Sequence, residues 1–265
     1  HKVTGVQTCA LPISQPDVDL CDRPEIDRWI LSVLHSLIKN VTAELDGYDP
    51  TKAGRMIDSF VNDDLSNWFV RLNRKRFWGK EMSRDKLSAY QTLYTCLETV
   101  ARLLAPFAPF YADQLYLDLI AVTKRDNVCS VHLARFPEAD ERFIDKELEA
   151  RMGLAQKITS MVLALRRKVN IKVRQPLQEI MIPAVDNEQR KHIEAVKDLI
   201  LNEVNVKDLK FAEGSSVLVK KVKCNFRTMG KKYGKLMKDI AAAMGTLSQD
   251  DIAREIGRAS CRERV

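Results

Sequence analysis

The stretch Leu65–Lys80 combines aromatic and basic side chains in a pattern that suits contact with RNA. It reads L-S-N-W-F-V-R-L-N-R-K-R-F-W-G-K and contains no acidic residue. Exposed cations hold a phosphate backbone, and an aromatic ring stacks on an unpaired base. We therefore predict RNA contacts from Arg71, Arg74, Lys75, Arg76, Trp78 and Lys80. The alternative is the solvated, charged end of an amphipathic helix.

Two further basic clusters lie in the second half of the chain. Residues 166–174 carry five cations and residues 219–238 carry eight, and neither range contains an acid. Cations that neutralise phosphates release counterions, which gives an affinity for nucleic acid that falls as salt rises. From these clusters we predict RNA contacts at Lys172, Arg174, Arg227, Lys231 and Lys232. A solvated face is again the alternative for each cluster.

The sequence supports no catalytic residue and no metal site. It lacks the nucleophile-elbow, zinc-protease and phosphate-loop motifs. We expect structural roles for His35 and His132. Asp63 and Asp64 are neighbours whose side chains diverge by about 100° on a helix, so we expect both at the surface rather than in one site. The cysteines form no Cys-x-x-Cys pair, which favours a reducing cytoplasm over a disulfide framework or a zinc site.

Composition indicates a soluble globular protein. The chain has 265 residues, of which 45% are hydrophobic and 30% charged, and its sequence pI is near 9.1. No apolar run approaches the roughly 20 residues of a membrane span, so we expect no membrane partner. Residues 1–14 and 255–265 resemble translated sequencing adapters, and we predict that 15–254 is an internal fragment of a longer protein. Residues 15–140 carry a net charge of −3 and residues 141–254 one of +8, which predicts two domains with those bounds.

Hydrophobic periodicity predicts a four-helix bundle in the first domain. Its expected helices are 24–48, 50–76, 86–104 and 110–122, and residues 131–133 are expected to form a short strand. In the second helix we place Trp68 in the core, because it shares one face with Leu65, Phe69 and Leu72.

The second domain reads as a small α+β unit. Its predicted helices are 145–169, 187–201 and 231–244, and its predicted strands are 177–183, 209–212 and 217–224. The spacing in the first of these helices predicts that Met161, Val162 and Leu165 point inward.

Several motifs, met in this order along the chain, resemble the anticodon-binding region of class I aminoacyl-tRNA synthetases, and of the isoleucyl enzymes in particular. They are D-R-W-I-L (27–31), S-N-W-F-V-R-L-N-R-K-R-F-W (66–78), L-A-P-F-A-P-F (104–110), S-V-H-L (130–133), N-I-K-V-R-Q-P-L (170–177) and Y-G-K (233–235). The resemblance covers nearly all of residues 20–254.

The resemblance implies a parent enzyme that attaches isoleucine to its tRNA with ATP and Mg²⁺. The catalytic and editing domains would lie outside this chain, so we expect the fragment alone to be inactive. Its expected partners are an isoleucine-accepting tRNA and the missing catalytic domain, and we expect a monomer. Two alternatives remain open: the same region of a valyl enzyme, and a helical interaction module that docks an acidic protein.

Overall fold

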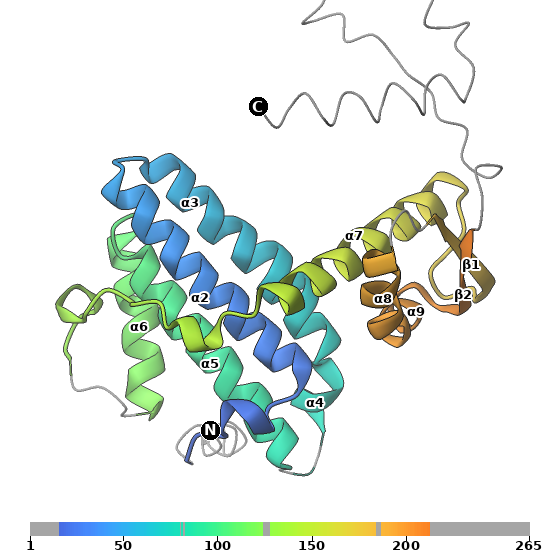
Figure 1. The fold of residues 1–265 in the computed structure, drawn as a ribbon. Coiled ribbons are helices and arrows are strands. Elements are labelled where there is room, and N and C mark those ends of the chain that lie inside the picture. Colours follow the sequence, from blue (N-terminus) through green and yellow to red (C-terminus); the bar gives the residue numbers. More distant parts are fainter. Residues whose placement is uncertain (1–15, 80, 82, 124–127, 184–186, 213–265) are drawn as a thin grey trace, which may run out of the picture. The chain divides into compact units, whose positions relative to one another are not determined.

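The chain forms two compact units with a boundary after Lys168. The computed structural model describes residues 16–79, 81, 83–123, 128–183 and 187–212. Figure 1 shows a helical bundle in the first unit, and two strands with two short helices in the second. This confirms the predicted fold class, which is mainly α with a small α+β region.

The first unit is built from helices of three kinds. Its α-helices are α2 (Glu25–Asp46), α3 (Pro50–Ser59), α4 (Arg74–Trp78), α5 (Arg84–Leu104), α6 (Pro109–Thr123) and α7 (Lys146–Lys168). Single 3₁₀ turns form η2 (Leu20–Asp22), η4 (Val131–Leu133) and η5 (Glu141–Phe143), and the π-helix η3 (Phe60–Val70) continues directly from α3.

Helix α2 is the central element of the bundle. It packs against α3, η3 and α5, while α6 lies along α5 (Figure 1). Trp29, Ile30 and Leu34 of α2 are almost fully buried, as are Phe60 and Phe69 of η3. Burying a large apolar side chain stabilises a fold by roughly 1.5–3 kcal/mol, so these residues hold the helices together.

Local sequence sets where the helices begin. The Asp49 side chain accepts a hydrogen bond from the Lys52 N–H at 3.0 Å, and Pro50 occupies the first turn of α3. Ser83 likewise accepts from the Lys86 N–H at 3.1 Å and begins α5. Each side chain satisfies an N–H that has no partner within the helix.

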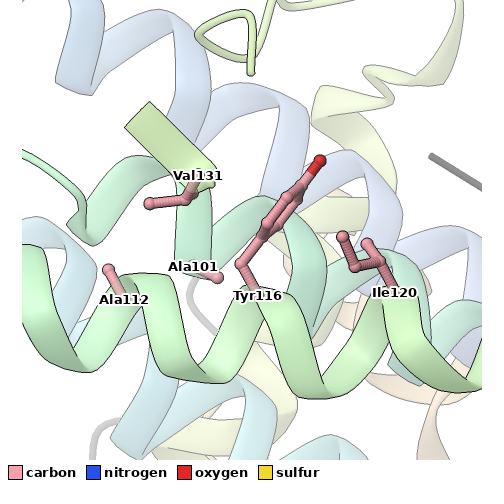
Figure 2. Close-up of a cluster of buried hydrophobic side chains, with 5 residues drawn as sticks. All are labelled: Ala101, Ala112, Tyr116, Ile120 and Val131. Atoms are coloured by element: carbon pink, nitrogen blue, oxygen red, sulfur yellow. The ribbon is translucent and has the colours of Figure 1, made fainter. Parts of the chain in front are cut away.

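A small apolar cluster closes the bundle beyond the P-F-A-P turn. Figure 2 shows Tyr116 and Ile120 of α6 with Ala101 and Val131, all buried. Val131 lies in the 3₁₀ turn η4, so the predicted strand 131–133 is wrong. The Asp113 carboxylate accepts hydrogen bonds from the Val131 N–H and the Ser130 hydroxyl, both at 2.8 Å. These local bonds curl the segment instead of leaving it extended.

The predicted continuous helix 50–76 is in fact three segments. The π-helix η3 takes over from α3 at Phe60, and the chain then breaks at Asn73 before α4. Asn73 has φ −90° and ψ 7°, and its side-chain amide donates to the Phe69 carbonyl at 2.9 Å. An asparagine side chain that bonds the backbone in this way competes with the regular helix.

Helix α7 lies in the first unit, whereas charge alone had suggested a division at residue 140. The Glu149 carboxylate accepts hydrogen bonds from Ser32 at 2.6 Å and Ser36 at 2.7 Å, which attach α7 to α2. Burial opposes ionisation of Glu149, but bonds from Lys146 and the two serines hold its pKa below the ordinary value.

The inward face of α7 is only partly the one predicted. Met161 and Leu165 are 59% and 61% exposed, and Val162 is only half-buried, so their predicted place in the core is wrong. The same spacing also predicts inward positions for Leu148, Ala155 and Ile158, and all three are buried, as is Met152. Helical periodicity marks an apolar face, but it does not show which part of that face is covered, and Met161 and Leu165 lie on an exposed part.

The second unit contains a two-stranded parallel sheet. Strand β1 (Leu177–Pro183) pairs with β2 (Val206–Ala212), and the chain between them forms α8 (Asn187–Ala195) and α9 (Lys197–Val204). Val196 separates these helices, so the predicted single helix 187–201 is interrupted. Strand β1 has its predicted bounds.

Several predicted features fall outside the described residues. They are the strand 217–224, the helix 231–244 and the adapter-like ends 1–14 and 255–265. Across the described part of the chain, no helix is both long enough and apolar enough to span a membrane.

Candidate nucleic-acid interface

Helix α4 presents basic and aromatic side chains outward, and we call Arg74–Trp78 the α4 platform. Its one buried residue, Phe77, packs edge-on against Phe69, with ring centroids 6.3 Å apart, and against Tyr90 at 5.3 Å. The Trp78 side chain is 79% exposed. Phe77 faces the bundle, whereas Arg74, Lys75 and Trp78 on the same short helix are exposed.

An ion-pair network fixes the platform to the bundle. The Arg76 guanidinium contacts both oxygens of Asp27, with Nη1 2.6 Å from Oδ1 and Nη2 2.9 Å from Oδ2. Its Nε donates to Asp85 at 2.9 Å, and the Ser88 hydroxyl donates to Asp27 at 2.6 Å. Asp27 is fully buried and begins α2, whereas Asp85 and Ser88 begin α5. Three segments of the chain therefore meet at one guanidinium.

This network makes Arg76 a structural residue. Its side chain is only 16% exposed, and Nη1 also donates to the Asn73 side chain at 2.9 Å. Burial opposes its charge, but hydrogen bonds to Asp27 and Asp85 raise the pKa of Arg76 above the ordinary value. The geometry therefore favours anchoring over the phosphate contact that we predicted for this residue.

The other residues of Leu65–Lys80 for which we predicted RNA contacts differ in exposure. Arg74, Lys75 and Trp78 are exposed together on the α4 platform, and Arg71 is half-buried just after η3. Lys80 lies outside the described residues. Trp68 is 5% exposed, which confirms its predicted place in the core.

The RNA contacts predicted from the two later basic clusters belong to the second unit. Lys172 and Arg174 are exposed in the segment before β1. The Asn205 side-chain amide donates to the Arg174 carbonyl at 3.2 Å and to that of Val173 at 2.9 Å, so this segment is fixed to the end of α9. Arg227, Lys231 and Lys232 lie outside the described residues.

Of the two histidines for which we predicted a structural role, His35 packs within the bundle. The His35 ring stacks on Phe143 with centroids 4.5 Å apart, and its Nδ1 accepts the Asp140 N–H at 3.0 Å. His132 is exposed in η4. Among the described residues, no group of His, Cys, Asp or Glu is arranged to hold a metal ion.

Sequence reasoning missed the acidic partners that position the platform. Asp27 is part of the D-R-W-I-L motif, but we assigned it no role of its own from the sequence. Asp64, expected at the surface, is partly buried and accepts a hydrogen bond from Gln156 of α7 at 2.9 Å. Burial raises the pKa of Asp64 despite that bond.

Comparison with known families identifies the class of protein. Residues 27–182 match the family described as the anticodon-binding domain of tRNA ligase. The chain belongs to this family. The matched range begins at the buried Asp27 and includes the whole α4 platform.

The most similar relatives considered are all named isoleucine–tRNA ligase. Those of Bacteroides thetaiotaomicron and Bacteroides fragilis are each 68% identical to this chain over 240 residues, and that of Porphyromonas gingivalis is 55% identical over 239. Each alignment covers 90% of this chain but 21% of the relative, so the chain spans about a fifth of their length. The matches confirm the resemblance to isoleucyl enzymes and favour neither the valyl nor the interaction-module alternative.

Proposed function

We propose that this chain binds the anticodon stem-loop of an isoleucine-accepting tRNA, as one part of a longer isoleucine–tRNA ligase. The observation that carries the proposal is the α4 platform, on which Arg74, Lys75 and Trp78 are exposed together. The names of the relatives supply the amino acid and the class of RNA.

The platform suits an RNA loop for physical reasons. Arg74 and Lys75 offer two positive charges within one helical turn, which favours neighbouring phosphates. The exposed Trp78 ring offers a face on which an unpaired base stacks, a contact worth about 1–3 kcal/mol. The Arg76 network holds the platform in one position, so little ordering is required when RNA binds.

The reaction of the parent enzyme belongs to domains outside this chain. In the proposed parent ligase, ATP would activate the amino acid and Mg²⁺ would neutralise phosphate charge, with both held by residues outside this chain. The role proposed for the described residues is recognition, with Lys172 and Arg174 as additional phosphate contacts. Arg227, Lys231 and Lys232 are proposed for the same role from sequence alone.

A salt titration tests the platform. The whole chain is mixed with a labelled anticodon hairpin of an isoleucine tRNA, and the affinity is measured as salt rises. Replacing Arg74 by alanine is expected to weaken binding and to reduce the salt slope by about 1, because one phosphate contact is lost.

The control variant is Arg55→Ala, which removes an exposed cation of α3. Equal loss of affinity in both variants would mean that only the overall charge matters, and would contradict the platform. Equal affinity for a hairpin with an unrelated anticodon would remove anticodon selectivity from the proposal and leave general RNA binding.

A further inference from the structure

A cleft of about 710 Å³ lies between η3 and α7, away from the residues of the α4 platform. Asn67 and Trp68 line it from η3, and Lys157, Met161 and Arg167 line it from α7. We call it the η3–α7 cleft. Its volume lies within the range of pockets that hold small organic ligands.

The walls combine apolar surface with positive charge. Met161 is 59% exposed, and Ala164 is exposed beside it. Three basic residues line the cleft, Arg71 among them, against one acid, Asp63, so the charge of the lining is +2. An apolar surface beside cations matches a nucleotide, whose flat base is attached to a phosphate.

Two buried polar atoms in the walls lack hydrogen-bond partners. They are Nε1 of Trp68 and Oγ1 of Thr159, whose residues are 5% and 2% exposed. A buried polar group without a partner costs about 1–3 kcal/mol, so such groups are uncommon. Both residues line the cleft, so a ligand there lies next to two side chains whose polar atoms have no partner.

The backbone on one side is also unusual. Asn67 and Trp68 belong to the π-helix, and π-helical turns occur frequently at functional sites. The hydrogen bond from Gln156 to Asp64 joins η3 to α7 at 2.9 Å, so the two walls are fixed to each other at one point.

We propose that the η3–α7 cleft receives one unstacked base of the RNA loop, with the adjoining phosphate beside Lys157 and Arg167. This inference rests on the proposed function and adds a second contact site to it. The base covers Met161, and its polar edge supplies an acceptor for the Trp68 N–H. Because the cleft belongs to a single compact unit, this contact requires no particular placement of the second unit.

Hairpins with one base removed test the proposal. Each loop nucleotide of the isoleucine anticodon hairpin is replaced in turn by an abasic one, and every hairpin is bound to the whole chain. Two variants are compared with the natural sequence: Ala164→Phe, which fills the cleft without changing charge, and Ala150→Phe, which adds the same ring elsewhere on α7, where Ala150 is exposed.

We expect Ala164→Phe to weaken binding of the intact hairpin roughly tenfold, the scale of one lost base contact. One abasic position is expected to weaken binding to the natural chain and to Ala150→Phe, but not to Ala164→Phe. A further variant, Met161→Ala, adds no volume and is also expected to weaken binding of the intact hairpin.

Two results would overturn the proposal while leaving the proposed function standing. One is that removal of each loop base weakens binding by the same factor in all variants, while the intact hairpin still binds. The other is a large drop in the melting temperature of Ala164→Phe with unchanged RNA affinity, which would show that another part of the chain fills the cleft. If the natural chain binds no hairpin at all, the proposed function and this inference both fall.

Discussion

Arg76 and Asp27 form a two-point ion pair between residues 49 positions apart in the chain. The carboxylate has no exposed surface, and the Arg76 guanidinium pairs with it at 2.6 Å. A buried charge is tolerated only when it is paired and hydrogen-bonded, so the stability of the bundle depends on this arginine.

Replacing Arg76 by alanine is therefore expected to lower the free energy of unfolding by about 3–5 kcal/mol, because Asp27 is left buried without its countercharge. Urea unfolding measures the change. The control is Arg74→Ala, an exposed neighbour on the same helix, which is expected to change stability by no more than about 0.5 kcal/mol. Similar losses in the two variants would refute a structural role specific to Arg76.

Replacing Trp78 by alanine is expected to weaken RNA binding by about 1–3 kcal/mol, the value of one stacked base, while leaving stability nearly unchanged. The reason is that this ring is 79% exposed and contributes little to the core. Fluorescence anisotropy with a labelled hairpin measures the affinity. Phe110→Ala removes an equally exposed ring, which is 90% accessible, and is expected to leave affinity unchanged. A loss of affinity in Phe110→Ala matching that in Trp78→Ala would count against stacking on the platform.

The stability of the bundle is expected to fall in mildly acidic solution because of His35. Burial lowers the pKa of this imidazole below 6.5, although the charge of Asp140 opposes the shift. The unfolded chain therefore takes up the proton first as pH falls. The contribution of His35 is complete above about pH 6.5 and declines as pH drops toward the pKa of the folded state.

Urea unfolding at several pH values between about 5 and 8 measures this dependence. The variant His35→Gln lacks the titrating group and is expected to show a flatter profile over the same range. A profile for the variant that is as steep as that of the natural chain would assign the dependence to other residues.

Replacing Thr159 by valine is expected to raise the free energy of unfolding by about 1 kcal/mol. The substitution removes a buried hydroxyl that has no partner while keeping the shape of the side chain. Thermal unfolding measures the effect. The matched control is Thr95→Val, in which a hydroxyl that donates to the Gln91 carbonyl at 2.9 Å is lost. Destabilisation of Thr159→Val would imply that its hydroxyl has a partner in solution.

Most of the fold could be predicted from the sequence because it depends on local periodicity. The apolar spacing of α2 and α5, the caps at Asp49 and Ser83, and strand β1 all follow from residues close together in the chain. The interruption at Asn73 was missed because the Asn73 side chain bonds both the backbone and Arg76.

The candidate site was only partly predictable. Counting charges singled out the segment 65–80, but it could not separate Arg74, which is exposed, from Arg76, which is paired with a distant carboxylate. The η3–α7 cleft was missed for a similar reason. Periodicity placed Met161 on an apolar face without revealing that this face is left uncovered in the described part of the chain.

The network around Arg76 also imposes an order on synthesis. A ribosome produces Asp27 first, Arg76 later, and Asp85 and Ser88 last. A nascent chain that has emerged only as far as α4 therefore lacks two of the groups that complete the network. Helix α4 is therefore expected to reach its final position only after α5 begins to leave the ribosome, so a nascent bundle holds no ordered α4 platform before that point.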